Sequence, residues 1–275
     1  MATEKEGGVE IAADKYRSFL HDEAHNTEWR HGGPPIFDTV NLLFEQGRTK
    51  ACPLLHNHLD LHTVFLCSVY IYIYVAYEWA KGSLEEVVQN AIKSWEMELS
   101  HKTRIQDFRT INPDKFKLIV NGREGLSAEE TLRLGSYNAL LKSSMPEEFK
   151  YYKVEEESFE SSHDAFREAL PRGFAWEVLA VHSGPPVIVF KFRHWGYFEG
   201  PFKGHAPTGE MVQFYGVGIL KVDELMRAEE VEIYYDPAEL FGPLLKAPLI
   251  SGPNTEQQQQ GTAASTSPQK CPFQN

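Results

Sequence analysis

Apolar residues recur at helical spacing in the first half of the chain and alternate with polar residues in the second half. Over residues 83–102, seven apolar positions from Leu84 to Leu99 fall on one face at a period of 3.6. Ser83 and Glu86 have the spacing of a capping box at the start of this stretch. The pattern predicts an amphipathic helix with one stripe facing a core.

Three further helices and one short strand are predicted around it. Ser127 and Glu130 begin a helix over residues 126–145. Asp38 is expected to cap a short helix in which Val40, Leu43 and Phe44 share a face. A short strand lies within residues 111–125, and residues 237–245 form a terminal helix.

Four strands are predicted from the alternating pattern after residue 173. They cover residues 173–183, 187–199, 210–222 and 229–236, with turns between them that are too short for crossover helices. Such turns join antiparallel neighbours in a meander. Helices followed by an antiparallel meander predict an α+β fold with the helices on one face of the sheet.

The charge pattern excludes some classes of partner. The 275-residue chain has a formal net charge of −12 and no block of Lys and Arg. Nucleic acids and anionic membranes both attract clustered cations, so we expect no nucleic-acid partner and no membrane partner. The first residues contain no apolar run of the kind found in signal peptides, so we expect a cytoplasmic protein.

Residues 51–77 interrupt these patterns. They contain His56, His58 and His62, followed by fifteen residues without charge. The uncharged run is shorter than the roughly 20 residues of a membrane-spanning helix. Its "YIYIYV" could be encoded by an AT repeat, which is typical of plant introns. We interpret 51–77 as an insertion, translated from a retained intron or a gene-model artefact, and therefore assign no metal site to the histidines.

The insertion divides the chain into four parts. Residues 1–50 form an N-terminal arm, residues 78–250 the main domain, and residues 251–275 a low-complexity tail that is expected to be disordered.

One loop and the last residue of one strand are similar to those of a known family. The loop has the pattern G-x-x-P-T-G-x-x-V, and the last strand ends in Asp236. Both features resemble the SnoaL-like polyketide cyclases of the nuclear transport factor 2-like superfamily. The stretches "SWEMELSHKT", "FRHWGYFEGPFKGHAPTGE" and "YYDPAELFG" are similar to the plant pathogen-related proteins.

This resemblance implies a cone: a strongly curved antiparallel sheet with helices packed on its concave side, around a pocket. It also implies a role in plant defence and no cofactor. The superfamily contains enzymes, ligand carriers and catalytically silent proteins, so the resemblance fixes no reaction.

Asp236 and His194 are the candidate catalytic residues. In the SnoaL-like cyclases the aspartate that matches Asp236 acts as an acid and base, and a carboxyl in an apolar pocket has the raised pKa that this needs. Asp236 could instead cap the terminal helix before Pro237. His194 alternates onto the same face as Phe190 and Phe192, where it could polarise a carbonyl or be an ordinary core histidine.

Other aromatic and polar residues could line the pocket, although such residues are more often part of a core. On the opposite face of the His194 strand, Arg193 and Trp195 are expected to stack on each other at the surface. The candidates for ligand binding are Tyr137, Trp176, Phe192, Tyr215, Tyr235 and His163.

Two functions remain open. The chain could be a plant defence-associated protein that binds a small hydrophobic metabolite in the cone pocket. Alternatively, it could be a cofactor-free cyclase or isomerase that uses Asp236. It has no HExxH, GxSxG, P-loop or GxGxxG motif. Homodimerisation through the outer face of the sheet is a further expectation.

Overall fold

The computed structural model describes residues 14–17, 27–48 and 79–250. The predicted insertion at 51–77, with its three histidines, and the predicted disordered tail at 251–275 lie outside the described residues.

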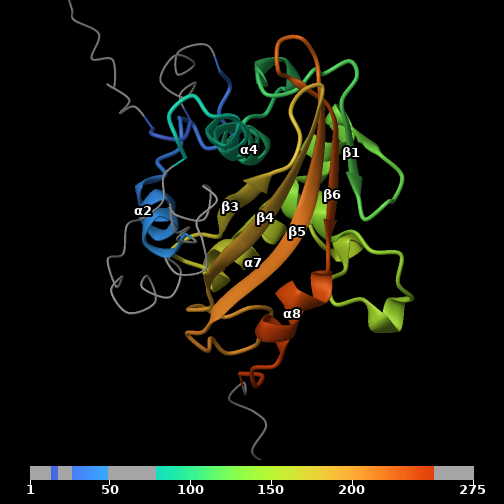
Figure 1. Ribbon diagram of the computed structural model, residues 1–275. Helices are drawn as coiled ribbons and strands as arrows, with labels where there is room; N and C mark the ends of the chain where they lie inside the picture. The colour runs from blue at the N-terminus through green and yellow to red at the C-terminus, as the bar shows by residue number, and fades with distance from the viewer. Residues whose placement is uncertain (1–13, 18–26, 49–78, 251–275) are drawn as a thin grey trace, which may run out of the picture.

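The main element is a six-stranded sheet (Figure 1). Strands β3 (Ala175–Val181), β4 (Val187–Tyr197), β5 (Met211–Val222) and β6 (Ala228–Tyr235) form the predicted antiparallel meander. The short strand β1 (Lys117–Val120) is also present as predicted.

The predicted antiparallel arrangement holds for the meander but not for β1. β1 pairs parallel to β6, and β2 (Leu126–Ser127) pairs antiparallel to β1, so the order is β2-β1-β6-β5-β4-β3. β1 belongs to the helical half of the chain and enters beside the last strand in the same direction. The sheet is therefore mixed, and the α+β class is confirmed.

Helices pack on one face of this sheet and along one of its edges (Figure 1). Among the described residues, the α-helices are α2 (Asp38–Gly47), α4 (Leu84–His101), α5 (Ala128–Leu134), α6 (Ser136–Leu141), α7 (Phe159–Ala169) and α8 (Pro237–Leu245). Short 3-10 turns are η2 (Ile105–Asp107), η3 (Glu147–Phe149) and η4 (Val154–Glu156).

Helix α4 begins and packs as its sequence predicts. The Ser83 side chain accepts a hydrogen bond from the Glu86 backbone amide. One buried polar residue then fixes the helix against β3. The Gln89 amide group donates to the Trp176 carbonyl at 3.0 Å and accepts from the Val178 amide at 2.7 Å. These two bonds hold α4 at a fixed distance from the sheet.

Three helix predictions need correction. The single helix predicted over 126–145 is broken into α5 and α6 at Gly135, whose φ of 79° lies in the left-handed region. The N-cap of α2 is Phe37, with no side-chain cap bond, so the predicted cap at Asp38 is wrong. Helix α7 was not predicted.

The register of the sheet gathers aromatic residues on one face, called here the inner face. His194 on β4 lies opposite Trp176 on β3 and Phe214 on β5. Phe192 lies opposite Gly216, where an added Cβ would come within 2.4 Å of the phenylalanine ring. The glycine therefore lets the ring lie flat over β5.

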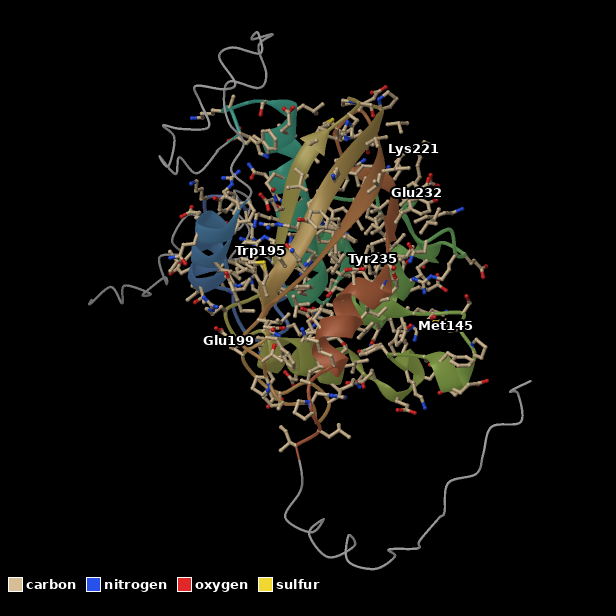
Figure 2. The ribbon with its side chains drawn as sticks, turned by 60° about the horizontal axis from the view of Figure 1, so that its bottom comes forward. Met145, Trp195, Glu199, Lys221, Glu232 and Tyr235 are labelled. Carbon is tan, nitrogen blue, oxygen red and sulfur yellow. The ribbon has the colours of Figure 1, made fainter. Side chains whose placement is uncertain are left out.

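The opposite, outer face is covered at the β3 edge by the N-terminal arm (Figure 2). Trp195 is fully buried there with Phe44 and Leu43 of α2. Arg193 forms an ion pair with Glu177 at 2.8 Å and stacks on the Trp195 ring at 4.9 Å. The predicted stacking is confirmed, but its predicted surface position is wrong because α2 covers it.

Candidate functional site

A cavity of about 530 Å³ lies between the inner face of the sheet and the helices. This volume is in the range of small-molecule sites. The sheet side contributes Phe174, Trp176 and His194. The helices and the arm contribute Trp95, Glu96, Met97, Leu99, Ser100 and His101 (α4), Ser136, Tyr137 and Leu140 (α6), Phe159, Glu160, His163, Asp164, Phe166 and Arg167 (α7), and Arg17, His31, Phe37 and Val40 (arm).

A second, much smaller cavity of about 30 Å³ adjoins it towards β6. Both cavities are lined by Tyr137, Leu140, Phe174, Trp176 and His194. Phe192, Phe214 and Tyr235 line only the smaller one. The walls of the smaller cavity are therefore almost wholly apolar, whereas the larger cavity combines aromatic and aliphatic residues with polar and charged ones.

Glu96 lies in the middle of α4, next to Trp95, and lines the larger cavity. It is half-buried. Burial raises the pKa of the Glu96 carboxyl, against the opposing effect of the Arg17 and Lys93 cations. Within the described part of the chain, this carboxyl has no hydrogen-bond or ion-pair partner.

His194 is buried among aromatic rings. Its ring centroid lies 3.9 Å from that of Phe174, 5.2 Å from Trp176 and 5.4 Å from Phe214. Burial lowers the pKa of His194 to about 3, and the Lys93 charge lowers it further in the same direction. The imidazole is therefore neutral at physiological pH, and its Nδ1 atom has no partner among the described residues.

Two more neutral histidines lie towards the arm. His101 Nδ1 donates to the Met97 carbonyl at 3.2 Å, and burial lowers the pKa of His101 to about 4. His163 Nδ1 donates to the Phe159 carbonyl at 2.8 Å, which leaves its Nε2 to accept from the Ser136 hydroxyl at 3.2 Å. Burial also lowers the pKa of His163.

Two cations act on Glu96, namely Arg17 and Lys93. Arg17 lies 3.7 Å above the Phe37 ring and donates to the Lys93 carbonyl at 3.3 Å. The Lys93 ammonium lies 3.8 Å from the centre of the Phe44 ring, and burial lowers the pKa of Lys93 to about 7. These groups bring positive charge close to Glu96.

Most of the residues selected from the sequence line the two cavities. Tyr137, Trp176, His163 and His194 line the larger cavity. Phe192 and Tyr235 line the smaller one, and the Tyr235 hydroxyl donates to the Leu140 carbonyl at 3.1 Å.

Tyr215 and Asp236 do not reach either cavity. Tyr215 is half exposed on the outer face, because it follows inner-face Phe214 by one residue. Asp236 is exposed and caps α8, where its carboxylate accepts from the Ala238 amide at 2.9 Å. The structure therefore supports the capping role of Asp236 and places it away from His194, so the predicted acid–base role has no support in the geometry.

Glu96, His101 and Arg17 were missed in the sequence. A signal for Glu96 was present, since a carboxyl interrupts the apolar stripe between Ile92 and Leu99. Arg17 carried no such signal, because its contact with α4 joins positions far apart in the chain.

Among the residues that the structure describes, no group of three or more His, Cys, Asp or Glu side chains is placed to hold a metal ion. Among the helices of residues 27–48 and 79–250, none combines the length and apolar content needed to cross a bilayer.

Comparisons with known proteins give one strong likeness. No family model matches the chain. A protein from barley (Hordeum vulgare) named pathogen-related protein is 44% identical over 254 residues, which covers 91% of this chain and 94% of the barley protein.

Solved structures give weaker likenesses. A protein from a Jannaschia species assigned to the SnoaL-like polyketide cyclases has 16% identity and a TM-score of 0.34, covering 62% of this chain and all of its own. A protein from Acidithiobacillus ferrooxidans assigned as a polyketide cyclase has 12% identity and a TM-score of 0.37, with the same coverage.

Proposed function

Because the chain belongs to the family of the barley pathogen-related protein, we propose that it is a plant defence-associated, cytoplasmic protein that binds a small hydrophobic metabolite. The observation that supports this function is the cavity of about 530 Å³ between the inner face and helices α4, α6 and α7. Its aromatic and aliphatic walls, with polar groups among them, have the character of a ligand site.

The shape of the ligand follows from the aromatic walls of the cavity. Trp95 and Trp176 lie with ring centroids 6.4 Å apart, and Tyr137 is stacked on Phe166 at 4.2 Å. Flat aromatic surfaces of this kind suit a rigid ring system better than a flexible chain. The proposed metabolite is therefore compact and mainly cyclic.

The enzymatic alternative required Asp236 inside the cavity. Because Asp236 is an exposed helix cap, the function that the geometry supports best is binding. The variant Asp236→Asn keeps a good N-cap residue, so we expect it to leave ligand binding and stability unchanged.

Native mass spectrometry of the protein purified from infected plant tissue tests the proposal. The wild-type protein is expected to carry a small-molecule adduct. Ser100→Trp places an indole in the cavity and should remove the adduct, because Ser100 lines the cavity on α4. Val217→Trp, on the exposed outer face, is the matched control that should keep it. An adduct that survives in Ser100→Trp would show that the ligand does not bind in this cavity.

A further inference from the structure

Several polar groups around the larger cavity have no partner in the described part of the chain. They are the Glu96 carboxyl, the Tyr137 hydroxyl, the Trp176 indole Nε1 and the His194 Nδ1. Trp176 is 4% exposed and His194 is 7% exposed. Glu96 and Tyr137 are half-buried. Native proteins pair nearly all buried polar groups, so the buried Trp176 and His194 nitrogens, together with two further polar groups on the same cavity, point to a ligand.

A neighbouring residue shows what a purely structural glutamate looks like on the same helix. Glu98 is fully buried, forms an ion pair with Lys102 at 2.9 Å and accepts from the Arg109 amide at 2.7 Å. Glu96, two residues earlier and half-buried at the cavity, has none of these bonds within the part of the chain that the structure describes. Packing alone therefore does not account for the carboxyl of Glu96.

The charges near Glu96 restrict the ligand. Arg17 and Lys93 both act on its carboxyl, so positive charge already lies beside Glu96. The other acids that line the cavity, Glu160 and Asp164, pair with Arg30 at 3.7 Å and with Arg167 at 2.6 Å. A cationic ligand would be repelled by Arg17 and Lys93. The neutral histidines His101 and His194 provide no further charge to hold an anion. A neutral ligand fits this balance best.

The unpartnered groups restrict the chemistry further. The Trp176 N–H can only donate, and the Tyr137 hydroxyl can donate and accept. Glu96 accepts through its ionised carboxylate, the form that the Arg17 and Lys93 cations favour against the effect of burial. A hydroxyl group on the ligand donates to Glu96 and accepts from Trp176 or Tyr137. A carbonyl or an ether satisfies the donors but leaves the carboxylate without a partner, which is costly in a buried site.

Resting on the proposed binding function, we infer that the ligand is a neutral aromatic alcohol or phenol whose hydroxyl group is held by Glu96 together with Tyr137 and Trp176. The rings of Trp95, Phe166 and Phe174 pack against its apolar part. Glu96 is then the residue that distinguishes a hydroxylated ligand from a hydrocarbon of the same shape.

Equilibrium dialysis with 2-naphthol and 2-methylnaphthalene tests this inference, because the two probes differ only in a hydroxyl or a methyl group. A site that pairs a hydroxyl rejects the analogue without it, so we expect the wild-type protein to bind 2-naphthol at least about tenfold more tightly. 2-Methoxynaphthalene, which can accept but not donate, should bind no better than 2-methylnaphthalene.

Variants of Glu96 separate its role from general packing. In Glu96→Leu the ratio of the affinities for 2-naphthol and 2-methylnaphthalene should fall close to one, while the affinity for 2-methylnaphthalene itself stays the same or rises. Glu96→Gln, which keeps the shape of the side chain, should give an intermediate preference. Glu85→Leu, on the first turn of α4 and outside the cavity, is the matched control and should keep the wild-type preference.

The outcomes distinguish this inference from the function on which it rests. Equal wild-type affinities for 2-naphthol and 2-methylnaphthalene would overturn the hydroxyl assignment and leave the binding function in place. An unchanged preference in a folded Glu96→Leu protein would overturn the role of Glu96. Failure of the wild-type protein to bind any of the probes would contradict the binding function itself.

Discussion

At the scale of single residues, the interior of this protein carries polar groups that do not contribute to stability. His194 is the clearest of them, since it is buried among Phe174, Trp176 and Phe214 with an unpartnered Nδ1 atom. A buried polar group without a hydrogen bond costs free energy in the folded state. Such a residue is kept for reasons other than packing.

The low pKa of His194 makes stability depend on pH. The folded pKa is depressed from 6.5 to about 3. The neutral form is therefore favoured by folding, and this contribution is present above pH 6.5 and is lost as the pH falls towards 3. In that window the unfolded chain binds a proton that the folded chain does not, which lowers stability by up to about 1.4 kcal/mol per pH unit.

We therefore expect His194→Phe to flatten the pH dependence of stability between pH 6.5 and 4. Urea denaturation at pH 7, 6, 5 and 4 measures the effect. At pH 7 the variant should be as stable as the wild type or more stable, because an unpaired polar group is removed. His182→Phe, at an exposed position, is the control and should keep the wild-type pH profile. Parallel profiles for His194→Phe and the wild type would contradict the predicted titration.

At the scale of helices and strands, the position of each wall of the cavity depends on a small number of local features. Gln89 fixes α4 to β3 through both ends of its amide. Gly135 turns the chain between α5 and α6, and so places Tyr137 over the cavity. At Gly135 an added Cβ would lie 2.6 Å from the Phe159 ring of α7.

Gly135→Ala should therefore destabilise the protein and weaken ligand binding together. The left-handed backbone alone costs about 1–3 kcal/mol for a residue with a Cβ atom, and the contact with Phe159 adds to this. Gly122→Ala has a similar φ of 69° with nothing within 4 Å, so it carries the strain without the contact. Urea denaturation should show the larger loss for Gly135→Ala. Equal losses would show that the contact with α7 has no energetic effect.

At the scale of the whole molecule, the N-terminal arm packs on the outer face of the sheet and also lines the cavity at the inner face. Its helix α2 buries Trp195 on the outer face, and Gly47 lies so close that an added Cβ would come within 1.9 Å of the indole. The same arm contributes Arg17 and Phe37 to the wall of the cavity. The packing of the arm and the closure of the cavity are thus parts of one arrangement.

This coupling predicts that a core substitution in the arm impairs ligand binding at a distance. Phe44 is fully buried against Trp195, so Phe44→Ala should cost about 3–5 kcal/mol. It should also weaken ligand retention, although Phe44 does not line the cavity. Leu42→Ala, at a half-exposed position on the same helix, should change stability by less than about 0.5 kcal/mol. Urea denaturation and native mass spectrometry of both variants measure the two effects, and normal retention in a destabilised Phe44→Ala protein would contradict the coupling.

Local patterns in the sequence were sufficient to predict most of the helices and strands. The stripe from Leu84 to Leu99 predicted α4, and the alternation after residue 173 predicted β3 to β6 with their inner faces. Both patterns depend on neighbours within a few positions, because periodicity is set by the local backbone geometry. The break at Gly135 was missed because a glycine inside a helical pattern has no distinct signature until its φ is known.

The site was predictable only in part, for a related reason. Alternation placed Trp176, Phe192 and His194 on one face, and that is where they lie. The same alternation, continued from Tyr235 to the next residue, puts Asp236 on the outer face with Glu232 and Tyr234, outside the cavity. Tyr215 is excluded by the same rule, since it neighbours inner-face Phe214.

Patterns among neighbouring residues were enough to predict the α+β class, the strands of the meander, helix α4 and the family, because each depends on residues that are close together along the chain. Three features are visible only in the folded chain: β1 joins β6 in parallel, α2 covers Trp195, and the Arg17 charge acts on the Glu96 carboxyl. These features join segments that are distant in sequence, and their positions follow from how the whole chain packs.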